Sequence, residues 1–233
     1  VKCLNWISMS DKKTVLVIGA SRGIGKELVK QFAAQSLETY GFARSLQNSS
    51  ENNVHYIHLD LLSPTIKSDF EQAISGIDQI DYLVHNAGFI AVKPFLELTR
   101  EDMHNCYQVN VLSVMEITQV CLPKMKPGGH IVMISSIGGF QGSSKFAGLA
   151  AYSTSKAALV SLTELLAEEF KNSGISINCL CLGAVQTEMM EEAFPGYQAP
   201  HQPAEIAEFI VDFTLHNGKY FHGKIIPVSV SNP

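Results

Sequence analysis

Two side chains four residues apart carry the most chemical information in this sequence. The segment is rich in small residues and reads Tyr152-Ser153-Thr154-Ser155-Lys156. In a helix, positions i and i+4 lie on one face, so the phenol and the ammonium project together. A nearby positive charge favours tyrosinate and lowers the pKa of the phenol toward neutrality, which suits a general acid in carbonyl reduction. The pair alone establishes no site, because most such pairs are neighbours on a surface helix.

A second motif lies near the start of the chain, between an apolar run at 14–19 and an amphipathic segment. It reads Gly19-Ala20-Ser21-Arg22-Gly23-Ile24-Gly25. Glycines let the backbone approach a pyrophosphate, and a helix N-terminus favours its negative charge. The spacing is G-x-x-x-G-x-G rather than G-x-G-x-x-G. The prediction of dinucleotide binding therefore depends on the strand–turn–helix context.

The end of the second predicted strand indicates which dinucleotide is bound. A carboxylate there would hold the 2′-hydroxyl of NAD and repel the 2′-phosphate of NADP. This strand ends without a carboxylate, and Arg44 follows it, with Arg22 in the turn opposite. The alternative is that both are solvated surface arginines. After the third strand, Asp60 and Leu61 are candidates for contact with the adenine, although Asp60 could equally cap a turn.

Three further motifs follow in order: Asn86-Ala87-Gly88, then Asn110, then Ser135-Ser136. With the glycine turn and the Tyr152–Lys156 pair, they resemble the short-chain dehydrogenase/reductase family over residues 13 to about 230, in particular its NADP-preferring carbonyl or 3-oxoacyl reductases. The resemblance implies that Tyr152 is the proton donor and that Ser136 orients the substrate carbonyl. It implies that Lys156 lowers the phenol pKa and that Asn110 holds a water linking Lys156 to solvent.

The resemblance also implies a set of residues that bind NADP(H). The backbone of Val185 and the hydroxyl of Thr187 would bind the nicotinamide carboxamide, and Lys156 would hold the ribose hydroxyls. The full predicted set is Gly19, Ser21, Arg22, Gly23, Ile24, Gly25, Arg44, Asp60, Leu61, Asn86, Ala87, Gly88, Tyr152, Lys156, Gly183, Val185 and Thr187.

The sequence departs from the family pattern at a few positions. The segment between Ser136 and Tyr152 is about three residues longer than usual, which leaves Ser143 as a second candidate for the catalytic serine. Leu182 replaces the usual proline before Gly183, and the last strand lacks the common Val-Asp-Gly-Gly. His85 stands where asparagine is common, and we interpret it as structural. None of these changes removes a catalytic group.

The elements that must position these residues alternate regularly along the chain. Short apolar runs predict strands at 14–19, 39–43, 54–59, 82–85, 130–135, 176–182 and 224–230. Amphipathic segments between them predict helices, including long ones at 100–125 and 151–172, one from Pro203, and one capped by Ser63 and Pro64. The order predicts an α/β fold, a doubly wound parallel sheet of about seven strands with helices on both faces.

Composition limits the remaining possibilities. The 233 residues fit one Rossmann-type domain at 13–233, preceded by a disordered extension at 1–12 in which Met9 is the more natural start. A net charge of −5 argues against nucleic acid, and no apolar run is long enough for a membrane helix. Five cysteines without a C-x-x-C motif favour free thiols in the cytoplasm over a disulfide or metal site.

These observations predict an oxidoreductase that transfers a hydride between NADP(H) and a small-molecule carbonyl or secondary alcohol. Two alternatives stay open. One is an NAD-linked alcohol dehydrogenase, against which the missing carboxylate argues, and the other is a non-catalytic NADP(H)-binding sensor or scaffold. The small and apolar residues of 100–125 and 151–172 exceed what a solvated helix needs, and by resemblance predict a homodimer or homotetramer.

Overall fold

The computed structural model describes residues 12–230, so the extension predicted at 1–12 lies almost wholly outside the described residues. One sheet of eight strands runs through the domain in the order β3-β4-β2-β1-β5-β6-β7-β8. The strands are β1 (Thr14–Ile18), β2 (Glu38–Ala43), β3 (Ser49–Glu51), β4 (Val54–His58), β5 (Ile80–His85), β6 (Met125–Ser136), β7 (Ser176–Leu182) and β8 (Ile225–Val228).

The sheet is parallel except at one edge. Only β3 runs antiparallel, paired with β4 through Ser49–Glu51. This short polar strand is the one that the sequence pattern misses, because three exposed residues carry no apolar signal. From β1 the chain winds outward in both directions, since β1 pairs with β2 on one side and with β5 on the other. The predicted doubly wound fold is confirmed.

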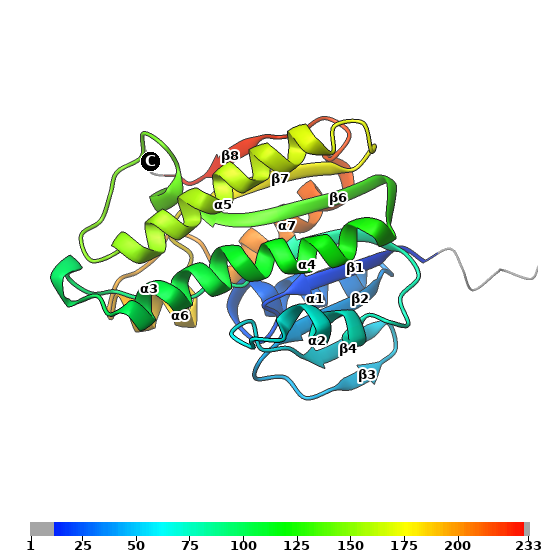
Figure 1. Ribbon diagram of the computed structural model, residues 1–233, viewed down its shortest axis with the longest axis horizontal. Helices are drawn as coiled ribbons and strands as arrows, with labels where there is room; N and C mark the ends of the chain where they lie inside the picture. Colours follow the sequence, from blue (N-terminus) through cyan, green and yellow to red (C-terminus); the bar gives the residue numbers. More distant parts are fainter. Residues whose placement is uncertain (1–11, 231–233) are drawn as a thin grey trace, which may run out of the picture.

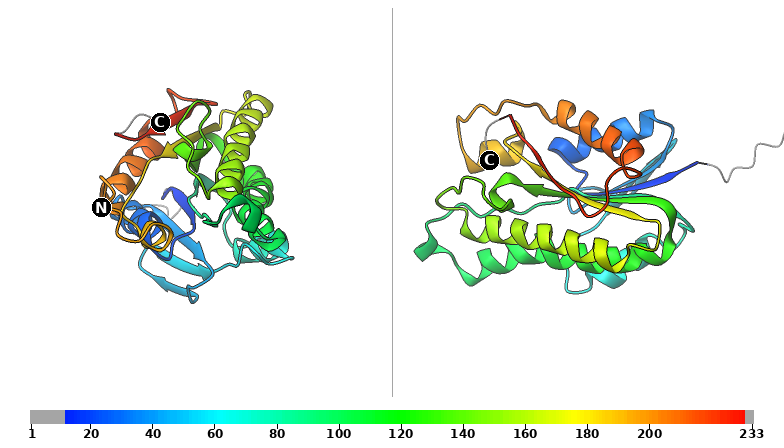
Figure 2. Two further views of the ribbon diagram at one scale, coloured as in Figure 1. Left: turned by 90° about the vertical axis from the view of Figure 1, so that its left-hand side faces the viewer. Right: turned by 90° about the horizontal axis from the view of Figure 1, so that it is seen from above.

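Helices cover both faces of the sheet (Figures 1 and 2). One face packs against α1 and α7, and the other against α2, α4 and α5. Their bounds are α1 (Gly23–Ala34), α2 (Ile66–Ala73), α3 (Arg100–Tyr107), α4 (Ser113–Cys121), α5 (Ala150–Glu169), α6 (Glu188–Ala193) and α7 (Pro203–His216). Each face has its own apolar core, because strands buried on both sides carry apolar residues toward both helical layers.

Two helix boundaries differ from the sequence expectation. The predicted helix at 100–125 is interrupted by a π-helical turn, Gln108–Leu112, which separates α3 from α4. The predicted cap at Ser63 is wrong, because α2 begins at Ile66 after Thr65. The hydroxyls of Ser63 and Thr65 instead donate to the Asp69 carboxylate, at 2.7 and 3.0 Å.

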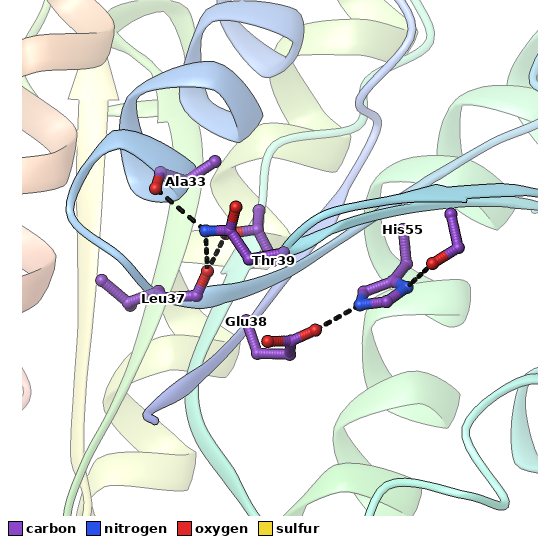
Figure 3. Close-up of polar contacts among 7 residues, drawn as sticks. Ala33, Leu37, Glu38, Thr39 and His55 are labelled. Atoms are coloured by element: carbon purple, nitrogen blue, oxygen red, sulfur yellow. Dashed lines mark hydrogen bonds and ion pairs between the residues drawn. The ribbon is translucent and has the colours of Figure 1, made fainter. Parts of the chain in front are cut away.

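Polar contacts hold the amino ends of β2 and β4 against the end of α1 (Figure 3). The Asn53 amide donates to the carbonyls of Ala33 and Leu37, joining the end of α1 to the start of β2. The His55 ring bridges Glu38 and the Ser50 hydroxyl. In open parallel sheets, ligands bind at the carboxyl ends of the strands, which is the end opposite to these contacts.

Candidate active site

A cavity of about 580 Å³ opens at the carboxyl ends of the central strands, where the winding direction reverses at β1 and β5. It gathers almost every residue selected from the sequence. These lining residues are Gly19, Ser21, Arg22, Gly23, Ile24, Arg44, Asp60, Leu61, Asn86, Ala87, Gly88, Ser136, Tyr152, Lys156, Gly183, Val185 and Thr187. Gly25 and Asn110 do not line the cavity; they contact residues behind its wall, as described below.

The glycine turn is shaped by close backbone approaches. Gly19 has φ of +90°, and a Cβ there would lie 2.6 Å from the backbone of Ala87. A Cβ at Gly25 would lie 1.8 Å from the Gly19 carbonyl oxygen, so only glycine lets α1 begin this close to β1. No side chain caps the first turn of α1. Its backbone N–H groups therefore remain available to an anion in the cavity.

The two arginines of the cavity differ in their surroundings. The Arg22 guanidinium forms a two-point ion pair with Glu192, next to α6 residues that close over the cavity. This partner raises the pKa of Arg22 and lowers that of Glu192. Arg44 follows β2, is exposed, and has no hydrogen bond or ion pair within residues 12–230. At the next strand, Asp60 accepts a hydrogen bond from the Leu62 N–H at 3.0 Å and so caps a turn.

The segment after β5 is held by two asparagines. The Asn86 amide donates to the Gly19 carbonyl at 2.8 Å, which ties the Asn86-Ala87-Gly88 motif to the glycine turn. Asn110 is fully buried in the π-helical turn. Its oxygen accepts from the Phe89 N–H, and its nitrogen donates to the Phe89 carbonyl and the Ser155 hydroxyl. Asn110 thus joins the 86–89 segment to α5.

Tyr152 projects from the first turns of α5 into the cavity, and its phenol contacts the Ser136 hydroxyl at the end of β6. Burial raises the pKa of Tyr152 above its usual value, and the contact with Ser136 opposes this only partly. Lys156 is not among the groups that shift the pKa of Tyr152, so the lowering expected from the sequence is not observed; the Lys156 Nζ lies 6.0 Å from the ring centroid and donates to the Ile134 carbonyl. The phenol is therefore neutral near pH 7.

Lys156 lines the inner wall of the cavity and is buried, with 3% of its surface exposed. Its Nζ donates to the Ile134 carbonyl at 2.9 Å. Burial lowers the pKa of Lys156 to about 8, partly opposed by the buried thiols of Cys179, Cys181 and Cys106. The Ser135 hydroxyl donates to the Lys156 carbonyl at 2.9 Å and so anchors α5 on β6.

The long segment between Ser136 and Tyr152 folds around a lysine. The ammonium of Lys145 donates to the carbonyls of Gly138 and Phe140 and to the Ser143 hydroxyl, at 3.1, 2.7 and 2.8 Å. The Ser143 hydroxyl donates back to the loop carbonyls of Ile137 and Phe140. Ser143 therefore organises this loop and does not line the cavity, whereas Ser136 does.

His85 lies next to this centre and is structural, as the sequence suggested. Its ring is 2% exposed, and Nε2 bonds with the Thr118 hydroxyl at 3.0 Å. Burial, with the nearby Lys156 ammonium, lowers the pKa of His85 to about 3. The ring is thus neutral at physiological pH, and it does not line the cavity.

The outer wall of the cavity is apolar. Met189, Met190, Phe194 and Tyr197 come from α6 and the residues after it, which together form a short lid over the cavity. Thr187 caps α6 by accepting from the Met190 N–H at 3.2 Å. Reasoning from the sequence missed Phe89, Ile90, Phe146, Leu149 and Glu188. They lie outside the motifs, and no periodicity marks irregular segments.

Comparison with known proteins agrees with this geometry. Residues 13–198 match the short chain dehydrogenase family. The chain belongs to the short-chain dehydrogenase family. It is 30% identical to the 3-oxoacyl-[acyl-carrier-protein] reductase of Aquifex aeolicus, covering 93% of this chain and 96% of the relative. It is 29% identical to an L-2,3-butanediol dehydrogenase of Corynebacterium glutamicum, again covering 93% and 96%.

Solved structures of this family superpose along nearly the whole chain. A short-chain dehydrogenase/reductase from Serratia marcescens is 27% identical with a TM-score of 0.80, covering 93% of this chain and 95% of that one. A 4-hydroxyisoleucine dehydrogenase solved with NADH has a TM-score of 0.83 at 23% identity, covering 94% and 97%, and supports the fold alone. Membership of this family makes the protein an oxidoreductase that uses a nicotinamide cofactor and acts on small molecules.

No helix within residues 12–230 has the length and apolar character needed to cross a bilayer. No group of three or more His, Cys, Asp or Glu side chains among these residues could hold a metal ion. The four cysteines in this range, Cys106, Cys121, Cys179 and Cys181, are buried free thiols.

Proposed function

We propose that this protein reduces a ketone or aldehyde with a hydride from NADPH, and that Tyr152 protonates the developing alkoxide. One observation carries the proposal. The Tyr152 phenol and the Ser136 hydroxyl meet at one end of a cavity whose other end is the glycine turn. A dinucleotide that extends from the turn toward these hydroxyls would place its reactive end beside them.

The residues present fit such a cofactor. A Cβ at Gly88 would stand in front of the Lys156 ammonium, 3.6 Å from Nζ, so glycine keeps this space open. Ser21 and the uncapped first turn of α1 would bind the pyrophosphate, and Asn86, Ala87, Gly88 and Gly183 would line its path. Val185 and Thr187 would bind the carboxamide. When bound, the cofactor supplies the hydride.

The protonation states suit reduction. Because burial raises the pKa of Tyr152, the phenol holds its proton near pH 7, which is the form that a proton donor needs. Ser136 would orient the substrate carbonyl by donating a hydrogen bond to the oxygen that becomes the alkoxide. Lys156 would hold the cofactor ribose and stabilise the tyrosinate left after proton transfer.

Asn110 would contribute through a water. Its side-chain oxygen accepts one hydrogen bond, from the Phe89 N–H, and a carbonyl oxygen has capacity for two. A water on the second lone pair would link Lys156 to solvent and restore the proton that Tyr152 loses. The observed bonds to Phe89 and Ser155 give Asn110 a second role, since they fix α5 relative to the 86–89 segment.

The preference for NADPH over NADH follows from charge at one end of the cavity. No carboxylate ends β2, and the free guanidinium of Arg44 lines the cavity at the end of that strand. A charge-assisted contact with a phosphate stabilises binding by about 1.5–3 kcal/mol. Arg22 would add to this contact once it leaves Glu192. The site therefore favours a 2′-phosphate over a 2′-hydroxyl.

We infer the assembly of the protein from its exposed apolar side chains, and its location in the cell from its buried thiols. Five exposed apolar side chains lie on the same helical layer: Met103 and Tyr107 on α3, Leu112 in the π-helical turn, Met115 on α4 and Leu165 on α5. A second copy of the chain would cover them in a homodimer or homotetramer. Buried free thiols fit a reducing compartment, which supports a cytoplasmic location.

Tyr152→Phe tests the proposed chemistry and separates an enzyme from a sensor. The change keeps the ring and its packing but removes the proton donor, so turnover of a carbonyl by NADPH should fall by roughly 10²- to 10⁴-fold while NADPH binding persists. NADPH absorbance and a fluorescence titration measure the two quantities. If the variant keeps wild-type turnover, the proton donor is a different group. If the wild type binds NADPH but reduces no carbonyl in a broad panel, a non-catalytic NADP(H)-binding sensor replaces the proposed reductase.

A further inference from the structure

The substrate end of the cavity differs chemically from the cofactor end. Beyond Tyr152, the wall is formed by two segments, the loop before α5 and the segment from α6 to Tyr197. Their lining side chains are Phe146, Leu149, Met189, Met190, Phe194 and Tyr197. The charged residues that line the cavity are Arg22, Arg44, Asp60, Lys156 and Glu188. Arg22, Arg44 and Lys156 were assigned above to the cofactor and Asp60 caps a turn, which leaves Glu188.

The cations near this wall are already engaged. Lys93 lies beside the loop, because its N–H donates to the Gly148 carbonyl, and its ammonium pairs with Asp102 at 2.6 Å. The Lys145 ammonium is held by three oxygens of its own loop. Apart from Lys156, which is assigned above to the cofactor ribose, no unpaired ammonium or guanidinium within residues 12–230 lines the apolar end, so a carboxylate or phosphate on the substrate would have no counter-ion of its own.

The negative charge of α6 also disfavours an anionic substrate. The helix α6 carries Glu188, Glu191 and Glu192, and Glu188 lines the cavity. Only Glu192 has a cationic partner, Arg22. An anion entering under α6 would therefore meet net negative charge and lose hydration without compensation.

We propose, on the basis of the carbonyl reduction proposed above, that the substrate is an uncharged ketone or aldehyde with an apolar body. The apolar wall binds that body, and Ser136 and Tyr152 supply the polar contacts at the carbonyl oxygen. Compounds that carry a carboxylate or phosphate near this wall are disfavoured. Selectivity thus comes from an apolar surface without a counter-ion, reinforced by an acidic lid.

Matched substrates test the role of charge. Methyl 5-oxohexanoate and 5-oxohexanoate share the same methyl ketone and differ in one negative charge and one methyl group. With NADPH present, kcat/KM for the ester should exceed that for the acid by roughly tenfold or more. Met190→Lys, which adds an ammonium to the wall, should narrow this ratio by improving the acid. Equal kcat/KM for ester and acid in the wild type would overturn the proposal.

A homologous series tests the role of the apolar wall. From butanone through 2-hexanone to 2-octanone, each buried methylene should raise kcat/KM by up to about fourfold. Phe194→Ala should flatten this dependence. Phe209→Ala, the same change at an exposed phenylalanine of α7 outside the cavity, should leave it unaltered. A wild-type series without any dependence on chain length would contradict the apolar wall.

The two proposals fail in different ways. If ketones are reduced but the acid is as good as the ester, carbonyl reduction stands and the inferred substrate class is wrong. If neither the neutral nor the charged compounds oxidise NADPH or NADH, both proposals fall together. Thermal unfolding of each variant separates loss of binding from loss of fold.

Discussion

The buried ammonium of Lys156 has a measurable cost in stability. Its pKa is about 8, against an ordinary 10.5, and the cause is burial of the charged form. Each pKa unit corresponds to about 1.4 kcal/mol, so the charged ammonium destabilises the folded state by about 3 kcal/mol near neutral pH. Lys156→Met, an uncharged side chain of similar length, removes this penalty.

The difference in stability between wild type and Lys156→Met should change with pH. Below pH 8, Lys156 is protonated in both folded and unfolded chains, and the whole penalty applies. Between pH 8 and 10.5 the folded protein releases this proton while the unfolded chain keeps it, so wild-type stability rises relative to the variant. Above 10.5 the lysine is neutral in both states and the penalty is gone.

The loss of one hydrogen bond in Lys156→Met opposes the gain in stability from removing the buried charge. Lys156→Met leaves the Ile134 carbonyl without the bond from Nζ, which costs about 1–2 kcal/mol. At pH 7 the variant should therefore be more stable than the wild type by about 1–2 kcal/mol. Near pH 10.5 the order should reverse, because only the lost bond remains. The same variant should lose the proposed carbonyl reduction, so the proposed function and the stability of the fold place opposite demands on this lysine.

Urea unfolding of nucleotide-free protein measures this difference. Wild type and Lys156→Met are compared at pH 7, 8.5 and 10 and at one protein concentration, since association affects apparent stability. Lys126→Met, the same change at an exposed lysine of β6, corrects for the global loss of one charge. If Lys156→Met is the less stable protein at pH 7, or if its difference from wild type is constant across this range, the reasoning about the buried ammonium is refuted.

Three further predictions concern the cofactor, the packing of α5 and assembly. Arg44→Ala should weaken NADPH binding roughly 10- to 100-fold and leave NADH binding unchanged. Glu192→Gln should strengthen NADPH binding up to about fivefold, because it releases Arg22 from an exposed ion pair. Fluorescence titration with NADPH and NADH measures both changes in affinity. Gly139→Ala should destabilise the protein by about 1–3 kcal/mol, because its Cβ would lie 2.6 Å from the α5 backbone, while Gly76→Ala meets no atom within 4 Å and serves as the control in thermal unfolding. Light scattering at micromolar concentration should report a dimer or tetramer, and a monomer would contradict the proposed assembly.

Much of the fold follows from local patterning. Apolar runs alternating with amphipathic segments specify parallel strands and covering helices, because each strand must be buried on both faces. The prediction fails where the signal is not apolar periodicity. The strand β3 is polar and exposed, and it forms because its backbone pairs with β4. The break between α3 and α4 occurs where Asn110 turns inward to bond Phe89.

The sequence by itself determined which groups are available to the site. The four-residue spacing places Tyr152 and Lys156 on one helical face, and glycines at 19 and 25 permit contacts that any side chain would block. These are local properties of backbone geometry, so they can be read along the chain. Residue type and spacing along the chain therefore suffice to indicate the groups proposed for catalysis and for the cofactor.

Only the tertiary structure decided how those groups behave. It buried Lys156 and lowered its pKa, and it raised the pKa of Tyr152, where spacing alone suggested the opposite. It paired Arg22 with Glu192, left Arg44 unpaired, and assigned Ser143 to a loop rather than to the cavity. Burial, pairing and cavity walls arise from segments distant in sequence, and these contacts set the energy of a charge and the chemistry of a pocket.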